Sequence, residues 1–202
     1  TLLRTVKLQT TSATCFPESR KVAFIAGNKY YNPLNDHYYE YYATNGNWLP
    51  RKDYAATQSY FGRVGYLATS TSQAENSFMC KLIGNNSWIG CSDEYTQINA
   101  AVGYTMYANQ TASEGKFYWV VGPEKGVKVS NQNGAYNNWS AGEPNNAGTE
   151  HYGHMYGGNG LWNDFANTQS IGTIIEYGGM PNDILTSQVV FTRNIYINGA
   201  PS

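Results

Sequence analysis

The chain of 202 residues is poor in charged side chains of either sign. Lys and Arg together number 13, Asp and Glu number 14, and the formal net charge is -1. The basic residues form no run, so the chain lacks the positive surface expected of a protein that binds nucleic-acid phosphates. We therefore expect no nucleic-acid partner.

Long apolar stretches are also missing. None reaches the length of about eighteen residues that a membrane-spanning helix needs, and the first residues lack the basic-then-apolar order of a signal peptide. We therefore expect no direct insertion into a membrane. Because the sequence begins at Thr1 rather than at Met, we expect a processed product or an excised piece of a longer chain.

Cysteine is scarce, since only Cys15, Cys80 and Cys91 are present. Three thiols allow at most one bridge within the chain, unlike the dense disulfide framework of small secreted scaffolds. The spacing of Cys80 and Cys91 permits a bridge between a helix end and a strand, and it equally permits two buried thiols. The sequence leaves both alternatives open.

Tyrosine and glycine are abundant instead, with 18 and 21 residues. This composition favours an exported module rich in strands and loops over a helical cytosolic enzyme. A chain of this length holds one main domain and, at most, flanking segments. Paired tyrosines on both sides of the turn-like residues 32–36 predict a hairpin, and packing within a sheet explains them better than a stacking surface for sugars.

Two segments in the first half of the chain carry helical patterns. Residues 52–61 hold a short apolar stripe, which predicts one helix. Ser72 and Glu75 have the spacing of a capping box, which predicts the start of a second helix. The face of this second helix that we expect to be buried consists of Ala74, Phe78 and Leu82.

The second half of the chain reads differently. After residue 90 the helical signals disappear, and strand-like runs at residues 117–121 and 173–177 are separated by long loops. A strand followed by two helices and a loop-rich β half predicts an α+β domain. A loop of such length needs a physical reason to be ordered, and a bound cation would supply one.

A set of acidic and amide residues stands within this loop-rich half. Glu143, Asn145, Glu150, Asn163 and Asp164 all carry side-chain oxygens. Ca²⁺ prefers such ligands, because it accepts about six to eight oxygens in irregular geometry. Amides also offer N–H donors beside the carbonyl oxygens, while ionised carboxylates only accept. The set therefore predicts a calcium site whose rim can bind a pair of sugar hydroxyls.

Five strings occur in the order that is typical of one known family. They read GYLAT with AEN at residues 65–76, WIG at 88–90, EGKFYWV at 114–120, NWSAGEPNN at 138–146 and GLWND at 160–164. With them the chain resembles the C-type lectin-like domain, especially that of bacterial surface proteins of the adhesin type. The resemblance covers residues 28–179. It leaves residues 1–27 and 180–202 as flanking β segments or linkers to neighbouring modules.

The resemblance implies an α+β fold with two helices, small antiparallel sheets and a long loop region that holds calcium. It also implies a cis peptide bond before Pro144. Two vicinal hydroxyls of a sugar would complete the coordination of the ion, each accepting from an amide and donating to a carboxylate. The implied calcium ligands are Glu143, Asn145, Glu150, Asn163 and Asp164, with the backbone carbonyl of Asp164 as a further oxygen.

The same resemblance implies a ligand class. Glu-Pro-Asn is the mannose-type sequence of the family, so we expect mannose, glucose, fucose or N-acetylglucosamine rather than galactose. We expect weak affinity, around millimolar, for one monosaccharide, and repetition would then be needed for useful binding. Acid should release the ion below about pH 5. The implied sugar contacts are Glu143, Asn145, Glu150 and Asn163, beside a wall formed by Tyr152 and Tyr156.

The chain departs from the family pattern in several places. Tyr152 and Ile175 stand where the family has paired cysteines, so other packing must replace that bridge. His151 and Asn146 stand where acidic residues are common, which weakens the case for a second calcium ion. Residues 92–113 match nothing in the family pattern, and both a specificity loop and a surface excursion remain open.

We expect an extracellular or cell-surface, non-enzymatic module of a larger adhesin that binds terminal sugars of glycans or polysaccharides. The alternative is a structural, protein-binding or ice-binding domain in which calcium only stabilises the loops, because a fold does not assign a function. His151 and His154 lack the further ligands of a zinc site. Glu143 and Glu150 are poor candidates for a glycosidase pair, because calcium ligands are held ionised. We expect Trp119, Trp139 and Trp162 in the core.

Overall fold

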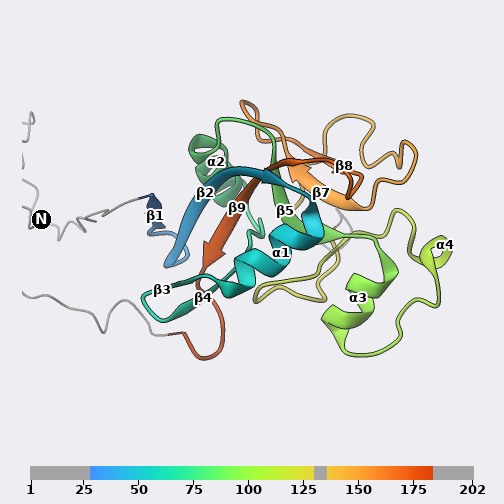
Figure 1. Cartoon of the computed structure of the whole chain (residues 1–202), viewed down its shortest axis with the longest axis horizontal. Coiled ribbons are helices and arrows are strands. Elements are labelled where there is room, and N and C mark those ends of the chain that lie inside the picture. Colours follow the sequence, from blue (N-terminus) through green and yellow to red (C-terminus); the bar gives the residue numbers. More distant parts are fainter. Residues whose placement is uncertain (1–27, 130–135, 184–202) are drawn as a thin grey trace, which may run out of the picture.

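The computed structural model describes residues 28–129 and 136–183 (Figure 1). The flanking segment expected at residues 1–27, with Cys15, and most of the segment expected at residues 180–202 lie outside the described residues; residues 180–183 are described and form no strand.

A nine-stranded sheet forms the centre of the molecule. Its strand order is β1-β2-β9-β5-β7-β8, while β4 pairs with β9, β3 with β4 and β6 with β5. All of these pairs are antiparallel except β5 with β9, which is parallel. The strands are β1 Lys29–Asn32, β2 His37–Gly46, β3 Ser59–Tyr60, β4 Arg63–Leu67, β5 Ser87–Ser92, β6 Tyr118–Trp119, β7 Tyr152–Met155, β8 Trp162–Phe165 and β9 Ile171–Tyr177.

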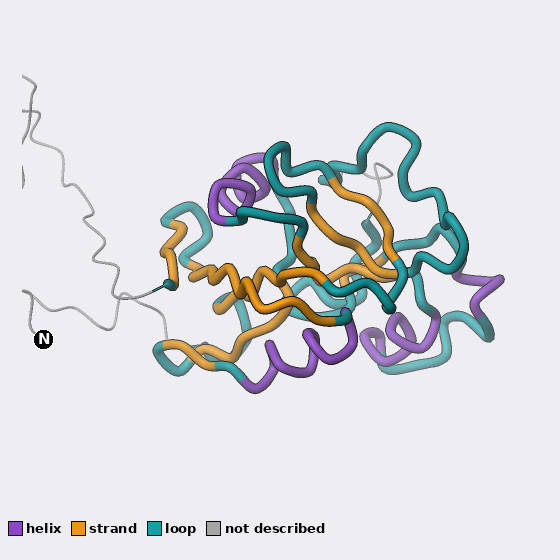
Figure 2. The backbone as a smooth tube through the Cα atoms, turned by 45° about the horizontal axis from the view of Figure 1, so that its top comes forward, coloured by secondary structure: helices purple, strands orange, loops and turns teal. Residues whose placement is uncertain are grey.

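Four helices accompany the sheet within the described residues: α1 Trp48–Thr57, α2 Gln73–Leu82, α3 Tyr95–Val102 and α4 Gln110–Ser113. Helix α2 lies on one side of the strands, and α1 and α3 lie on the other (Figure 2). Two apolar clusters match this division, one containing Met79 of α2 and the other containing Trp48 of α1 and Ile98 of α3. None of the helices in the described parts is long and apolar enough to cross a bilayer.

The tyrosine-rich start of the described chain forms the predicted hairpin. Strands β1 and β2 pair with Tyr30 opposite Tyr39 and Tyr31 opposite Tyr38. Tyr39 is fully buried, and its ring packs edge-on against Phe78 at a centroid distance of 5.3 Å. The prediction that these tyrosines pack within a sheet is therefore confirmed.

The first helix is displaced from its predicted position at residues 52–61. Helix α1 begins at Trp48, whose buried indole N–H donates to the carbonyl oxygen of Ile89 at 2.9 Å. At the other end, residues 59–60 form strand β3, and the chain turns at Phe61 with a positive φ of 50°. The predicted boundaries were wrong because a contact distant in sequence, rather than local periodicity, determines where this helix begins.

The second helix begins as predicted at the cap residue Ser72. The Ser72 side chain accepts from the Glu75 N–H at 3.2 Å. The Glu75 carboxylate does not return to Ser72, because it accepts from the N–H of Thr71 at 2.7 Å. The second hydrogen bond of the capping box, which the Glu75 carboxylate accepts, therefore comes from the residue before the cap rather than from the cap itself.

The predicted buried face of this helix was right for Phe78 and Leu82, which pack against the core, and wrong for Ala74. Ala74 is exposed, while Glu75, Asn76 and Met79 are buried. Asn76 is buried because it has partners there: its side-chain oxygen accepts from the indole N–H of Trp162 at 2.7 Å. The prediction was based on the spacing of apolar residues, and this spacing does not reveal a helix face that packs through hydrogen bonds. Phe78 and Leu82 pack against the core only in part.

Residues 92–113 contain two helices that the sequence did not indicate. Helix α3 is capped by Glu94, whose carboxylate accepts from the Gln97 N–H at 3.1 Å, and it ends at Gly103 with a left-handed φ of 82°. Helix α4 is capped by Asn109, which accepts from the Ala112 N–H at 3.0 Å. The prediction of two helices therefore missed two more. Helix α3 gave no signal because a glutamate is an uncommon cap, and α4 gave none because it is only 4 residues long.

Of the three tryptophans predicted in the core, Trp119 and Trp162 are buried there and Trp139 packs against it partly buried. The rings of Trp119 and Trp139 both pack edge-on against Trp162, at centroid distances of 5.7 and 5.8 Å. Trp162 is fully buried, and Trp139 also forms an isolated β-bridge to it. This packing fixes the strand that carries the next two residues, Asn163 and Asp164.

The two described cysteines are free thiols. Cys91 is buried, which raises the pKa of its thiol, and Cys80 is half-buried. Of the two alternatives that the sequence left open, the structure therefore shows Cys80 and Cys91 without a disulfide bridge. Tyr152 and Ile175, which stand where the family has paired cysteines, lie in one apolar cluster, so packing takes the place of that bridge.

Candidate functional site

The predicted ligands lie on strand β8 and on the loop that precedes strand β7 (Figure 1). The peptide bond between Glu143 and Pro144 is cis, as the resemblance implied. Strand β8 runs antiparallel to β7 with Asp164 opposite Gly153. A Cβ at position 153 would lie 2.2 Å from the sulfur of Cys91, so glycine allows β7 to approach β5 closely.

Asp164 anchors the loop. Its side chain is only 1% exposed, and its two oxygens accept from the backbone N–H groups of Asn145 and Asn146 at 3.1 and 2.8 Å. The loop therefore wraps around a carboxylate on a rigid strand. This brings Asn145, at the surface, next to Asp164 although the two residues are distant in sequence.

Glu150 closes a small turn with the same loop. Its carboxylate accepts from the Ala147 N–H at 3.1 Å, and its own N–H donates to the side-chain oxygen of Asn146 at 3.0 Å. The side-chain oxygen of Asn145 also accepts from the Ala147 N–H, at 2.8 Å. The oxygens of Asn145 and Glu150 thus share one backbone donor and must lie close together.

Glu143 has an unmet hydrogen-bonding capacity. Its Oε2 atom is buried and has no hydrogen-bond partner among the described residues. Burial, followed by the hydrogen bond and charge of Asp164 and the charge of Glu150, raises the pKa of Glu143, although a hydrogen bond with Asn145 opposes this. Burial and then the charge of Asp164 also raise the pKa of Glu150, although the Ala147 N–H opposes this. The negative charges of the three carboxylates therefore repel one another, and a cation bound between them would reduce this repulsion.

The amide of Asn163 is turned inward. Asn163 lies opposite His154 in the β7–β8 pair, and its Nδ2 atom is 3.2 Å from Nε2 of the histidine. The same nitrogen donates to the backbone carbonyl oxygen of Asp164. The structure therefore places the nitrogen of this amide, rather than its oxygen, beside the carbonyl that the resemblance implied as a further ligand.

The two tyrosines predicted to line the sugar differ in position. Tyr156 is half-buried, its ring packs edge-on against His154 at a centroid distance of 4.8 Å, and burial, followed by the charges of Glu143, Glu150 and Asp164, raises its pKa. Tyr152 is only 6% exposed and packs against Trp48 at a centroid distance of 4.7 Å. The prediction for Tyr152 needs correction, because β7 is buried on both faces and this ring belongs to the core.

The ligand atoms of Glu143, Glu150 and Asp164 do not all lie within 4.8 Å of one another. Among the described residues, two other groups of acidic and histidine side chains have ligand atoms that all lie within 4.8 Å of one another, and the set of Glu143, Glu150 and Asp164 is not one of these groups. Oxygens on opposite sides of a Ca²⁺ ion lie about 5 Å apart, because each bond is about 2.4 Å long. The three carboxylates are therefore not already drawn together as closely as those of the other two groups.

One of those two groups lies next to the predicted site. The ring nitrogen Nδ1 of His151 is 3.0 Å from Asp93 and 3.8 Å from Glu114. Asp93 is fully buried, and burial raises its pKa to about 7 although the Gly115 N–H opposes this. The histidine thus occupies the space between two carboxylates. Sequence reasoning identified His151 as a departure but missed its partners, because they lie about 40 to 60 residues earlier in the chain.

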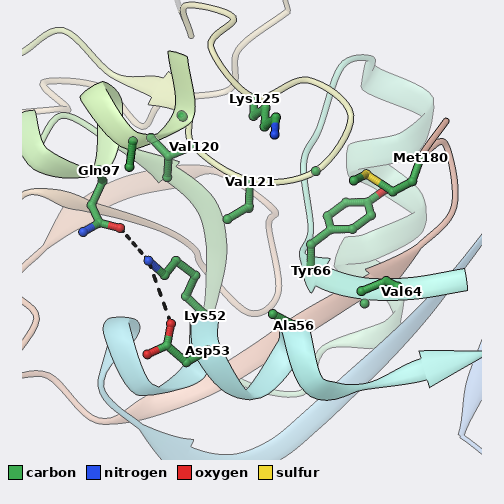
Figure 3. Close-up of a pocket in the computed structure, with 14 residues that line it drawn as sticks. Lys52, Asp53, Ala56, Val64, Tyr66, Gln97, Val120, Val121, Lys125 and Met180 are labelled. Carbon is green, nitrogen blue, oxygen red and sulfur yellow. Dashed lines mark hydrogen bonds and ion pairs between the residues drawn. The ribbon is translucent and has the colours of Figure 1, made fainter. Parts of the chain in front are cut away.

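A separate groove of about 330 Å³ lies between α1 and α3 (Figure 3). Lys52 of α1 donates to the side-chain oxygen of Gln97 of α3 at 2.7 Å and so links the two helices. Ala56, Val121 and Met180 contribute apolar surface to the groove. None of the predicted ligand residues lines it. Helix α3 forms one wall, so this part of residues 92–113 shapes the surface away from the predicted site, whereas Asp93 and Gln110 contact His151 beside that site.

The described fold is that of the C-type lectin-like domain. The C-type lectin CEL-I from Cucumaria echinata matches with a TM-score of 0.56 and 21% identity, over 76% of this chain and 97% of that chain. The cow CD23 carbohydrate-recognition domain, solved in the presence of a GlcNAc2Man3 oligosaccharide, matches with 0.52 and 24%, over 76% and 95%. A calcium-independent type II antifreeze protein matches with 0.53 and 16%, over 78% and 97%. At these identities the likeness concerns the fold alone.

Two curated relatives resemble the chain in sequence. Halomucin from Haloquadratum walsbyi is 33% identical over 100% of this chain, which spans 2% of Halomucin. A Perlucin-like protein from Mytilus galloprovincialis is 32% identical over 54% of this chain and 60% of its own length. The chain therefore corresponds to a small part of the first relative and to somewhat more than half of the second. No protein-family model matches the chain.

Proposed function

We propose that residues 28–179 form an extracellular, non-enzymatic module that uses one Ca²⁺ ion to bind vicinal hydroxyls of a terminal sugar. The sugars proposed are of the mannose, glucose and fucose type, because the loop carries Glu143-Pro144-Asn145. The observation that carries the proposal is the buried Oε2 atom of Glu143, which has no hydrogen-bond partner among the described residues and lies near Asp164 and Glu150.

The residues present fit a calcium ion. The Oε2 atom of Glu143 has no donor among the described residues, and a cation would supply the missing partner. Glu143, Asn145 and Glu150 would hold the ion from the loop, while Asn163 and the Asp164 carbonyl would hold it from β8. Carboxylate and amide oxygens are the ligand types that Ca²⁺ prefers. When bound, the ion would supply open coordination positions for two hydroxyl oxygens.

The chain's own side chains would then select the sugar. Glu143 and Glu150 can accept hydrogen bonds from the hydroxyls, and the exposed amide of Asn145 can donate to them. Tyr156, whose pKa is raised by burial and then by the charges of the three carboxylates, would contact a face of the sugar ring. Asp164 keeps the loop in place through the backbone of Asn145 and Asn146. No proton transfer to a sugar is part of this proposal.

Several relatives support a binding role within a longer protein. The fold is shared with a carbohydrate-recognition domain solved in the presence of an oligosaccharide. The chain spans 2% of Halomucin, so a module of this kind can occur within a very long chain. We propose that it acts as part of a larger adhesin, in which several weak contacts combine into useful binding.

The second candidate is a structural, protein-binding or ice-binding domain that needs no sugar. One observation favours it: both Asp164 oxygens already accept backbone N–H groups, so the loop is held together by its own hydrogen bonds. A calcium-independent antifreeze protein also shares the fold. The two candidates differ in whether calcium is required for a ligand to bind.

A glycan array with and without a calcium chelator tests the proposal. We expect binding to mannose-type sugars that is lost in chelator and lost in Glu143→Gln. The double change Glu143→Gln with Asn145→Asp is expected to redirect binding toward galactose. Asp53→Asn is a matched control, because the Asp53 side chain is 78% exposed and lies on α1. Sugar binding that survives the chelator, or a protein partner retained by the double variant without any sugar binding, would favour the second candidate.

A further inference from the structure

The inference concerns a second cleft, which is separate from the groove between α1 and α3. Its volume is about 490 Å³, and its lining comes from the end of β2, the turn after α2, the loop after β7 and the start of β9. Three asparagines, three glycines and Ile171 form this lining, and none of them carries a charge. The cleft therefore suits a neutral ligand rather than an ion.

The side-chain amides of this lining can bind hydroxyl groups. Asn45 and Asn85 are exposed, and their amides have no hydrogen-bond partner within the described parts of the chain. The side-chain oxygen of Asn86 accepts from the Gly157 N–H at 3.2 Å, and its amide nitrogen remains available to donate. An amide nitrogen donates and an amide oxygen accepts, while a hydroxyl does both. A ring that carries several hydroxyls therefore matches this lining.

The walls of the cleft are fixed by hydrogen bonds and close packing. The backbone carbonyl oxygen of Asn45 accepts from the side chain of Arg51 at 2.5 Å. That of Asn85 accepts from the hydroxyl of Ser87 at 3.0 Å. A Cβ atom at Gly157 would lie 2.7 Å from the backbone of Asn85, so glycine lets the loop after β7 approach the turn after α2. Rigid walls lower the entropic cost of binding a ligand.

The cleft lies close to the strand pair that carries the proposed calcium site. Gly157 directly follows Tyr156, whose ring packs edge-on against His154 at a centroid distance of 4.8 Å. His154 stands opposite Asn163, one of the predicted ligands. Three residues of extended chain span at most about 11 Å, so Gly157 lies within that distance of His154. A ligand longer than one sugar ring can therefore reach both places.

We propose that this cleft is a second sugar subsite, which holds a further neutral sugar of an oligosaccharide whose terminal sugar occupies the proposed calcium site. The inference rests on the proposed function and extends the ligand from one sugar to a short chain. The amides of Asn45 and Asn85 would bind hydroxyls of the further sugar, and Ile171 would contact an apolar face of its ring. Contacts at two places on one ligand raise its affinity without strengthening either contact.

Removal of the free amides tests the subsite in the full chain. At saturating calcium we expect a mannose trisaccharide to bind about tenfold more tightly than methyl mannoside, the size of about one hydrogen bond. The double variant Asn45→Ala with Asn85→Ala should lose this advantage and keep its affinity for methyl mannoside and for calcium. Asn47→Ala is the matched control, because Asn47 does not line the cleft and its side chain makes no cap hydrogen bond. Calorimetry with a panel of trisaccharides that differ in linkage measures these affinities.

NMR of the unsubstituted chain gives a second test. The trisaccharide that binds most tightly should shift the side-chain amide signals of Asn45, Asn85 and Asn86, and methyl mannoside should not. Calcium-dependent binding of methyl mannoside with no gain for any trisaccharide, or with unchanged amide signals, overturns this inference alone. A gain that the double variant retains does the same, because the cleft then takes no part in binding. The absence of any calcium-dependent sugar binding overturns the proposed function and the inference with it.

Discussion

Two groups of acidic side chains lie in different parts of this molecule, and their hydrogen bonding differs. One group, Glu75 and Glu176, lies on α2 and β9 beside the first hairpin. The other, Glu143, Glu150 and Asp164, lies on β8 and on the loop before β7. Both groups concentrate negative charge. Only the second contains a buried carboxylate oxygen with no partner among the described residues.

Glu176 in the first group is fully satisfied by protein donors. One oxygen contacts Nδ1 of His37 at 2.5 Å and lies 2.8 Å from the hydroxyl of Tyr39, whose single proton is shared with Glu75. The other accepts from the backbone N–H of Thr69 at 2.9 Å. Burial and the nearby charge of Glu75 raise the pKa of Glu176, although His37 opposes this.

Glu75 is satisfied in the same way. One oxygen accepts from the Tyr39 hydroxyl at 2.6 Å and from the amide of Asn35 at 2.9 Å, and the other accepts from the Thr71 N–H at 2.7 Å. These bonds join the first hairpin to α2. The density of acidic side chains is therefore a poor guide to a cation site, and unmet hydrogen-bonding capacity is a better one.

The largest expected effect follows from removing an acid of the first group. Glu176→Ala leaves His37 without its carboxylate and the buried Thr69 N–H without its acceptor. We expect a loss of about 3–5 kcal/mol in the free energy of unfolding, the range for breaking a buried pair. Urea denaturation in chelator measures it. Glu143→Ala is the matched control and should lose less than about 1 kcal/mol, because the Glu143 oxygen is already unpaired. Equal losses would contradict the contrast between the groups.

Calcium is expected to act on the second group only. At an ion concentration of about one hundred times Kd, the free energy of unfolding should rise by about 2.7 kcal/mol. Glu143→Gln should abolish this gain, because the neutral amide leaves the site with one charge fewer, and Glu75→Gln should leave the gain intact. Thermal melts across a calcium titration measure both variants. A gain that persists in Glu143→Gln and disappears in Glu75→Gln would assign the ion to the first group instead.

The fold was predicted from the sequence where the informative residues are local. The five strings lie at the tryptophans and loops that build the core and the site, so they identified the α+β fold and the position of the loop. The start of α1 was not predictable, because it depends on a hydrogen bond from Trp48 to Ile89, 41 residues away. Helix α3 was missed because its cap is Glu94, which is not a usual cap residue.

The site was predicted as a set of residues but not as an arrangement. Residue types and spacing predicted which oxygens would bind an ion beside β8, and this set stays a prediction. The inward turn of the Asn163 amide toward His154 in the neighbouring strand could not be read from the sequence. The burial of Tyr152 was missed because β7 is covered on both faces, so alternation along the strand gives no sign of which side chains reach the surface. Pairing between strands that are distant in sequence decides both features.

A smaller effect also distinguishes the two groups: the stability that depends on the first group and the calcium affinity that depends on the second should change with pH in opposite directions. Burial lowers the pKa of His37, but the hydrogen bond and charge of Glu176, with the charges of Glu75 and Glu124, raise it overall. A raised pKa means that this group stabilises the fold below the ordinary histidine value of 6.5 and that the stabilisation is lost as the pH rises through the raised value. Stability in chelator should therefore fall as the pH rises above 6.5, with Glu176 contributing in the same direction.

The second group should respond in the opposite direction. The raised pKa values of Glu143 and Glu150 mean that protons compete for these carboxylates already above the ordinary glutamate value of 4.5, so calcium affinity should weaken as the pH falls toward it. Urea melts and calcium calorimetry at several pH values measure the two trends. His37→Gln should flatten the first trend and leave the second unchanged. A single trend shared by stability and calcium affinity would contradict the separation of the groups.

The smallest expected effect concerns the rim of the site. Tyr156→Ala should weaken sugar binding by about 1 kcal/mol, or roughly fivefold, because a ring beside the sugar is lost. Calcium affinity should not change, since Tyr156 is not a proposed ligand. Tyr104→Ala is the control, because Tyr104 is an exposed tyrosine in residues 92–113. Sugar titrations at saturating calcium measure the effect, and equal sugar affinity in the two variants would remove Tyr156 from the site.

The most direct test of the account is an anomalous diffraction map from crystals of the protein grown with calcium. The account predicts one strong peak bonded to oxygens of Glu143, Asn145, Glu150, Asn163 and Asp164. A map without a peak there would contradict it. A single peak within the Asp93, Glu114 and His151 group, or within the His37, Glu75 and Glu176 group, would contradict it equally.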